Sequence, residues 1–225
     1  MGWPHCLIKI SITWAGKSSH APNRILSHYS LVSETFLESA TASIKEYSQY
    51  FTPEDVPGAL VKLIEFADTQ SGWFSQGFEL ECDAEDLMFK SYSERSEFLD
   101  SLFAIGHADG TGSTYAIWRE SGALDDAPVV AFGSEGGAHV VASNLLGLFR
   151  ILTLDAEPMT SWDEVTYYKP DDAEPSEGAA DYSDWLARNF RVGPLRDAKE
   201  ATQIVKDAQK AKEKKFQEWL KQFAG

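Results

Sequence analysis

Three residues in the middle of the sequence, His107, Glu135 and His139, are of types that could do chemistry. Imidazole and carboxylate groups that converge can hold a metal ion or transfer protons. All three lie close to glycine-rich turns, so one end of a sheet could bring them together. Polar residues beside hairpins more often bond to the turn backbone, and we favour that interpretation here and for Asp109.

Other catalytic motifs are absent from the sequence. The five histidines form no HxH or HExxH pair, and the glycines of residues 106–112 lack the Gly-Lys-Ser/Thr ending of a phosphate loop. No GxSxG nucleophile motif occurs. Cys6 and Cys82 are too few for a disulfide framework and have no metal-ligand spacing. We therefore expect no cofactor, no metal ion and no enzymatic activity, and an unrecognised hydrolase that uses His107, Glu135 and His139 remains the alternative.

The elements expected to position these residues form a meander of about four strands, followed by a helix. The strands are predicted at residues 103–108, 115–118, 129–132 and 138–142, from apolar runs separated by turn residues. Asp109 with Gly110 and Gly112 suits a hairpin that needs positive φ. Tyr115 and Ile117 should share one face of the sheet, and Ala116 and Trp118 the other. Asn144 can then start a helix with apolar residues at helical spacing, namely Leu145, Leu148, Phe149 and Leu152.

The flanking segments add helices to this sheet. Apolar spacing predicts an amphipathic helix at 25–47 and another after Pro57, and Ser91 with Glu94 could form a capping box. The predicted fold class is α+β: an antiparallel sheet of about four to six strands packed against helices, with N- and C-terminal helical extensions.

Three stretches of this sequence, residues 104–118, 128–135 and 140–152, together resemble the SUKH superfamily, many of whose bacterial members neutralise polymorphic toxins. The shared pattern is a lead-in helix, an Asp-Gly-x-Gly hairpin, a strand ending in a Ser-Glu turn and a packing helix. The resemblance extends weakly back to Trp73 and Leu60 and does not cover residues 1–50 or 160–225. It implies an α+β immunity protein that binds a toxin.

Four segments are distinguished on this basis: an N-terminal extension and helix at 1–50, the SUKH-like domain at 51–155, an acidic linker at 156–194 and an amphipathic helix at 195–225. The proline-rich, acidic stretch 155–184 predicts a draped or partly disordered linker. The last helix is expected to pack on the body of the same chain, with a partner groove or a membrane surface as alternatives.

Charge is distributed unevenly along the chain. The formal net charge is −15, residues 34–100 carry 15 acidic against 4 basic side chains, and residues 191–225 carry 9 basic against 5 acidic ones. An acidic surface repels nucleic acid and anionic membranes and attracts basic proteins. No apolar run reaches the roughly 20 residues that span a bilayer, and no signal peptide is evident, so a cytoplasmic location is expected.

The function predicted from these features is an immunity protein that binds a cognate bacterial toxin, expected to be basic, and occludes its active site or substrate surface. An intracellular regulatory or scaffolding protein is the alternative. Aromatic residues would anchor the partner and acidic residues would orient it. The predicted partner-binding residues are Trp73, Phe74, Asp83, Glu85, Asp86, Glu94, Asp125, Asp126 and Glu135.

Overall fold

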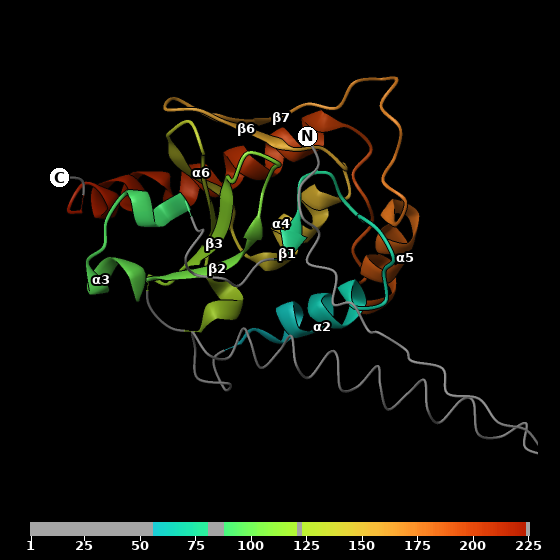
Figure 1. Cartoon of the computed structure of the whole chain (residues 1–225), viewed down its shortest axis with the longest axis horizontal. Helices are drawn as coiled ribbons and strands as arrows, with labels where there is room; N and C mark the ends of the chain where they lie inside the picture. Colours follow the sequence, from blue (N-terminus) through green and yellow to red (C-terminus); the bar gives the residue numbers. More distant parts are fainter. Residues whose placement is uncertain (1–55, 81–87, 121–122, 224–225) are drawn as a thin grey trace, which may run out of the picture.

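The computed structural model describes residues 56–80, 88–120 and 123–223, and their centre is a five-stranded antiparallel sheet (Figure 1). Each strand lies beside its neighbour in sequence, in the order β1-β2-β3-β4-β5. The strands are β1 Glu79–Leu80, β2 Leu102–His107, β3 Thr114–Trp118, β4 Val129–Phe132 and β5 Ala138–Ala142. The predicted α+β class and the meander are confirmed. The helix expected at 25–47 lies outside the described residues.

Helices cover both faces of the sheet. Tyr115 and Ile117 pack in one apolar cluster with α2 Gly58–Ala67, α4 Leu145–Leu152 and α5 Ala179–Phe190. Ala116 and Trp118 pack in a second cluster with α3 Ser96–Leu99 and the C-terminal half of α6 Ala198–Leu220. The predicted alternation of β3 is therefore confirmed, and the sheet is the middle of three layers.

Two predictions about helix starts have different outcomes. Asn144 caps α4, because its Oδ1 accepts a hydrogen bond of 3.0 Å from the Gly147 amide. The Ser91–Glu94 capping box is wrong. Ser91 ends a 3-10 helix, Met88–Ser91, and donates to the Met88 carbonyl, whereas α3 begins after Arg95 without a side-chain cap.

The segment predicted as a linker is folded. It forms a hairpin of β6 Pro158–Thr160 and β7 Val165–Tyr167 and then α5. Val165 and Tyr167 alternate with polar residues and are buried against the core, where the Tyr167 and Tyr115 hydroxyls lie 2.9 Å apart. The expectation of a draped or partly disordered linker is wrong, because these apolar side chains anchor the hairpin to the sheet.

Helix α6 lies along β5, the last strand of the sheet. The Glu213 carboxylate accepts the outward-pointing Val140 amide at 2.8 Å, and the Gln217 amide donates to the Ala138 carbonyl at 2.6 Å. These contacts satisfy backbone groups that an open sheet edge would leave unpaired. The prediction that the C-terminal helix packs on its own chain is confirmed. Among helices of the described residues, none has the length and apolar character needed to cross a bilayer.

Candidate functional site

The three residues that could do chemistry do not converge. His107 in β2 shares a row of the sheet with Phe132 and Ala138, whereas His139 in β5 is paired with Ala131 in the adjacent row. The two histidines therefore point to opposite faces of the sheet and lie three strands apart. Neighbouring strands are spaced by about 4.8 Å. Glu135 is exposed in the turn between β4 and β5. Within the described ranges, no group of three or more His, Cys, Asp or Glu side chains could hold a metal ion.

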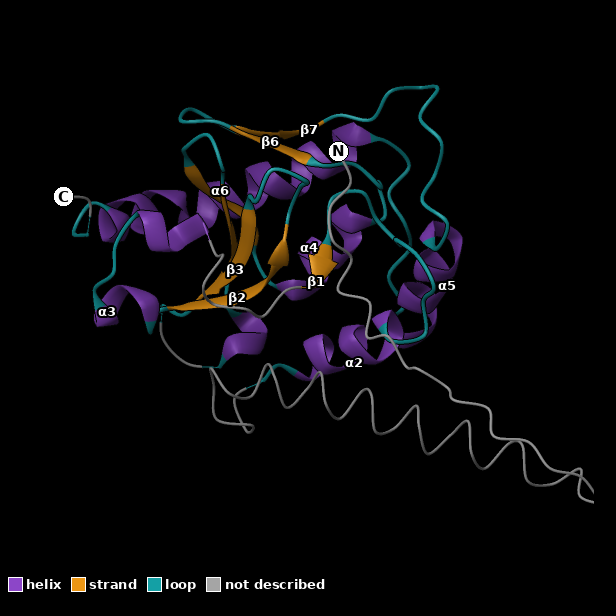
Figure 2. Ribbon diagram, viewed as in Figure 1, coloured by secondary structure: helices purple, strands orange, loops and turns teal. Residues whose placement is uncertain are grey.

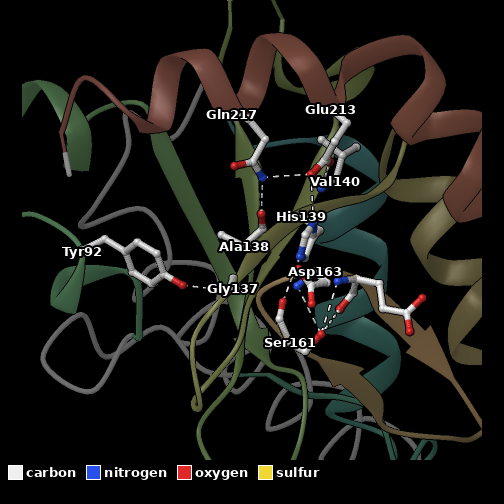
Figure 3. Close-up of polar contacts among 10 residues, drawn as sticks. Tyr92, Gly137, Ala138, His139, Val140, Ser161, Asp163, Glu213 and Gln217 are labelled. Atoms are coloured by element: carbon white, nitrogen blue, oxygen red, sulfur yellow. Dashed lines mark hydrogen bonds and ion pairs between the residues drawn. The ribbon is translucent and has the colours of Figure 1, made fainter.

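His139 instead links three elements (Figure 3). Its Nδ1 lies 2.9 Å from the Glu213 Oε1 on α6, and its Nε2 lies 2.9 Å from the Ser161 carbonyl in the β6–β7 turn. Burial by itself lowers the pKa of His139, but the hydrogen bonds to Glu213 and Ser161 and the charges of Glu213 and Asp163 outweigh it and raise that pKa. Both partners are acceptors, so the protonated ring, which donates from both nitrogens, fits this position best.

The predicted partner-binding residues are scattered over the structure. Asp83, Glu85 and Asp86 lie outside the described residues. Trp73 is 51% exposed, but Phe74 is only 6% exposed, and its ring stacks on Tyr182 at 4.8 Å between centroids. Phe74 is therefore a core residue and is not available as a surface anchor.

The four remaining predicted acids are all exposed and come from three different connecting segments. Glu94 precedes α3. Asp125 and Asp126 lie in the 3-10 helix Leu124–Asp126 immediately before β4, whereas Glu135 follows the same strand. The length of β4 thus separates Asp125 and Asp126 from Glu135.

Exposed acidic and large apolar residues follow one another along the segment that was predicted as a linker. We define the hairpin surface as the exposed side chains of residues 157–177. The backbone of this segment runs through β6, β7 and the loop that leads to α5 (Figure 2). Its three large apolar residues are exposed to 61%, 74% and 65%, namely Met159, Trp162 and Tyr168. Its exposed acids are Glu157, Asp163, Glu164, Asp171, Asp172, Glu174 and Glu177. The one basic residue of this segment, Lys169, donates to the buried Asp155 at 2.9 Å, so it is already paired.

Asp155 fixes the base of the hairpin surface. It is 3% exposed and has a positive φ of 56°. Its Oδ1 accepts from the Gln76 amide at 2.8 Å and the Ser176 hydroxyl at 2.6 Å, and its Oδ2 accepts from the Ser176 amide at 2.7 Å and from Lys169. Burial would raise the pKa of Asp155, but these hydrogen bonds, those of Ser176 first, lower it. Both ends of the acidic loop 169–176 are thereby tied to the body of the protein.

Two residues of the sequence-based prediction adjoin the hairpin surface. The Trp73 carbonyl accepts the Gly178 amide at 2.9 Å, directly after Glu177. Glu135 precedes Gly136, which lies against the Trp162 indole. The hairpin surface itself was missed, although its signal was present in the sequence: large aromatic residues within a strongly acidic, proline-containing stretch.

The hairpin surface combines exposed aromatic side chains with carboxylates. Aromatic side chains are enriched at the energetic centres of interfaces, and carboxylates select a positively charged partner. Comparison of the chain with protein-family models, with curated proteins and with solved structures gave no match.

Proposed function

We propose that this protein binds a basic protein partner through the hairpin surface, and that the partner is a toxin whose active site or substrate surface becomes occluded. One observation carries the proposal. Met159, Trp162 and Tyr168 are largely exposed among seven carboxylates, and the segment's one base is already paired with Asp155.

The exposed side chains of this surface suit association with a protein partner. Exposed Trp and Tyr side chains lose little conformational entropy on binding and bury a large apolar area. The carboxylates add electrostatic attraction, which raises the rate of encounter with a basic protein. Because Asp155 and His139 already hold the segment, little further ordering is required at the moment of binding.

The identity of the partner as a toxin is supported by the SUKH resemblance of residues 104–118, 128–135 and 140–152. That resemblance concerns the scaffold, and the hairpin surface follows it in the sequence. Immunity proteins act by complementarity to the toxin and need no catalytic group of their own. An acidic surface suits a nuclease toxin in particular, because an enzyme that binds nucleic acid is basic around its active site.

A pair of matched charge reversals tests the proposal. Asp171→Lys/Asp172→Lys changes two exposed neighbouring acids on the hairpin surface, and Asp125→Lys/Asp126→Lys makes the same change before β4. The candidate partner is the protein encoded by the neighbouring gene, tested for toxicity and rescue in cells and for association rate in vitro.

The expected result is asymmetric. Asp171→Lys/Asp172→Lys should slow association by about tenfold or more at low salt and weaken its salt dependence, while Asp125→Lys/Asp126→Lys has a small effect. Equal effects from both variants would mean that only net charge matters, and the hairpin surface would be eliminated. A partner that binds without toxicity would favour the regulatory or scaffolding alternative.

A further inference from the structure

Trp162 has an unusual position for a residue so exposed. Its indole lies on the backbone of the β4–β5 turn, where a Cβ added to Gly136 would come within 2.4 Å of the ring carbons. A Cβ on Gly137 would come within 1.8 Å of the Ser161 carbonyl oxygen. Both glycines have positive φ, 105° and 84°. The turn thus passes directly beneath the hairpin tip and supports the indole, which is nevertheless 74% exposed.

Three acidic residues are close to this indole along the chain or through Gly136. Asp163 and Glu164 follow Trp162 in the turn, and Glu135 precedes Gly136 beneath the ring. All three acids are exposed, and none of them takes part in an ion pair among the described residues. The charge of Asp163 contributes to the raised pKa of His139, but the ring of His139 is bonded to Glu213 and Ser161 and does not pair with Asp163.

An electron-rich ring face with carboxylates around it is complementary to an organic cation. Of the two basic side chains, arginine fits better. Its guanidinium is planar, is weakly hydrated, stacks on aromatic faces and still donates in pairs to carboxylates. A lysine ammonium holds its hydration more strongly and has no plane to stack.

We propose that Trp162, with Glu135, Asp163 and Glu164, binds an arginine side chain of the partner. This inference rests on the proposed function and names the residue type that the hairpin tip recognises. The guanidinium would stack on the open face of the indole, and the carboxylates would accept its N–H groups. The hairpin tip then provides specificity, while the acids of loop 169–176 provide long-range attraction.

The experiment uses the full chain and a hexa-arginine peptide as the probe, with hexa-lysine and hexa-citrulline as comparisons. Citrulline keeps the shape of arginine and lacks its charge. Indole N–H signals of the ¹⁵N-labelled protein are followed by NMR, and the Trp162 signal is identified by its loss in Trp162→Leu. Trp73→Leu is the matched control, because Trp73 is also an exposed tryptophan.

Hexa-arginine should shift the Trp162 indole signal. The Kd of hexa-arginine should rise about five- to tenfold in Trp162→Leu and stay within twofold of the wild-type value in Trp73→Leu. Hexa-lysine should bind more weakly than hexa-arginine, and hexa-citrulline should leave the signal in place. Equal Kd values for the wild type and Trp162→Leu would overturn the arginine site, as would a failure of hexa-arginine to shift the Trp162 signal. If Asp171→Lys/Asp172→Lys still slows association with the protein partner in that case, the proposed function stands without the arginine site.

Discussion

Replacing Asp155 by alanine tests whether one buried carboxylate holds the hairpin surface in place. The side chain of Asp155 is only 2% exposed and accepts four hydrogen bonds, from Gln76, Lys169 and twice from Ser176. These donors come from the loop before β1 and from the two ends of the acidic loop. Asp155→Ala removes every one of these bonds, so the loop 169–176 loses its attachment to Asp155 at both ends.

The size of the effect follows from the burial of each donor. The Ser176 amide belongs to a residue that is 8% exposed, so leaving it without an acceptor costs about 1–3 kcal/mol. The Lys169 ammonium and the Gln76 backbone amide are nearer to solvent, so leaving each without its acceptor costs about 1 kcal/mol. Alanine also tolerates the positive φ less well than aspartate, by about 1 kcal/mol. Asp155→Ala should therefore lower the free energy of unfolding by about 4–6 kcal/mol.

Asp155→Asn separates the charge from the shape of this side chain. Asparagine tolerates positive φ and keeps one acceptor oxygen, so we expect a loss of about 2 kcal/mol. The measurement is urea unfolding at pH 7 together with hydrogen exchange of the Ser176 amide. Asp172→Ala, which removes an exposed carboxylate of the same segment, is the control and should change stability by less than about 0.5 kcal/mol.

The pH dependence of the same variants provides a second check. Because the folded pKa of Asp155 is lowered, its ionised form stabilises the fold above the ordinary value of 3.8, and this stability is lost as the pH falls through the folded pKa. The difference in the free energy of unfolding between the wild type and Asp155→Asn should therefore be largest at neutral pH and should shrink in acid. A loss below about 1 kcal/mol for Asp155→Ala at pH 7 would refute the reasoning, as would a difference that is unchanged in acid.

Two further predictions concern the contacts between β5 and α6. Glu213→Leu leaves the Val140 amide and the His139 ring without their acceptor, so the free energy of unfolding in urea should fall by about 3 kcal/mol. Glu213→Gln keeps one acceptor oxygen and should lower the free energy of unfolding by less. Equal losses from the two variants would contradict this account. Because the folded pKa of His139 is raised, its contribution to stability is full below the ordinary value of 6.5 and is lost as the pH rises through the folded pKa. The free energy of unfolding of the wild type and of His139→Gln, measured at several pH values, should therefore differ more at acidic than at alkaline pH. A difference that stays constant or grows as the pH rises would contradict the role of the charged ring.

Local sequence patterns predicted the central sheet and α4 correctly. In β3, alternation assigned Tyr115 and Trp118 to opposite faces, since adjacent strand residues point in opposite directions. At α4, the Asn144 side chain caps the backbone of its own next turn, which is a contact within the sequence window. Such features depend on neighbours in the chain and need no knowledge of the rest of the fold.

The hairpin β6–β7 could not be predicted in the same way. Each of its strands has three residues, which is too short for alternation to stand out against the prolines and acids around it. Its stability depends on partners far away in sequence, such as the contact between the Tyr167 and Tyr115 hydroxyls. The burial of Phe74 against Tyr182 on α5 is a tertiary contact of the same kind.

The candidate chemistry of His107 and His139 was also decided by tertiary structure. Both histidines stand beside glycine-rich turns, which suggested one common end of the sheet. The register places them in adjacent rows, and a shift by one residue moves a side chain to the other face. Ring contacts with α6 and the β6–β7 turn then assign His139 to a structural link, and neither contact is visible in a short stretch of sequence.

Helix α6 packs beside β7, and the lysines of α6 that form ion pairs pair with acids outside the hairpin surface. Lys212 and Lys215 both pair with Glu120 at the far end of β3, and Glu200 pairs with Arg150 and Arg196. The carboxylate of Glu213, which faces the hairpin, bonds to His139 and Val140. Among the described residues, no ion pair joins a hairpin carboxylate to a basic side chain of α6. Under the function proposed above, the basic partner would supply the positive charge that pairs with these carboxylates.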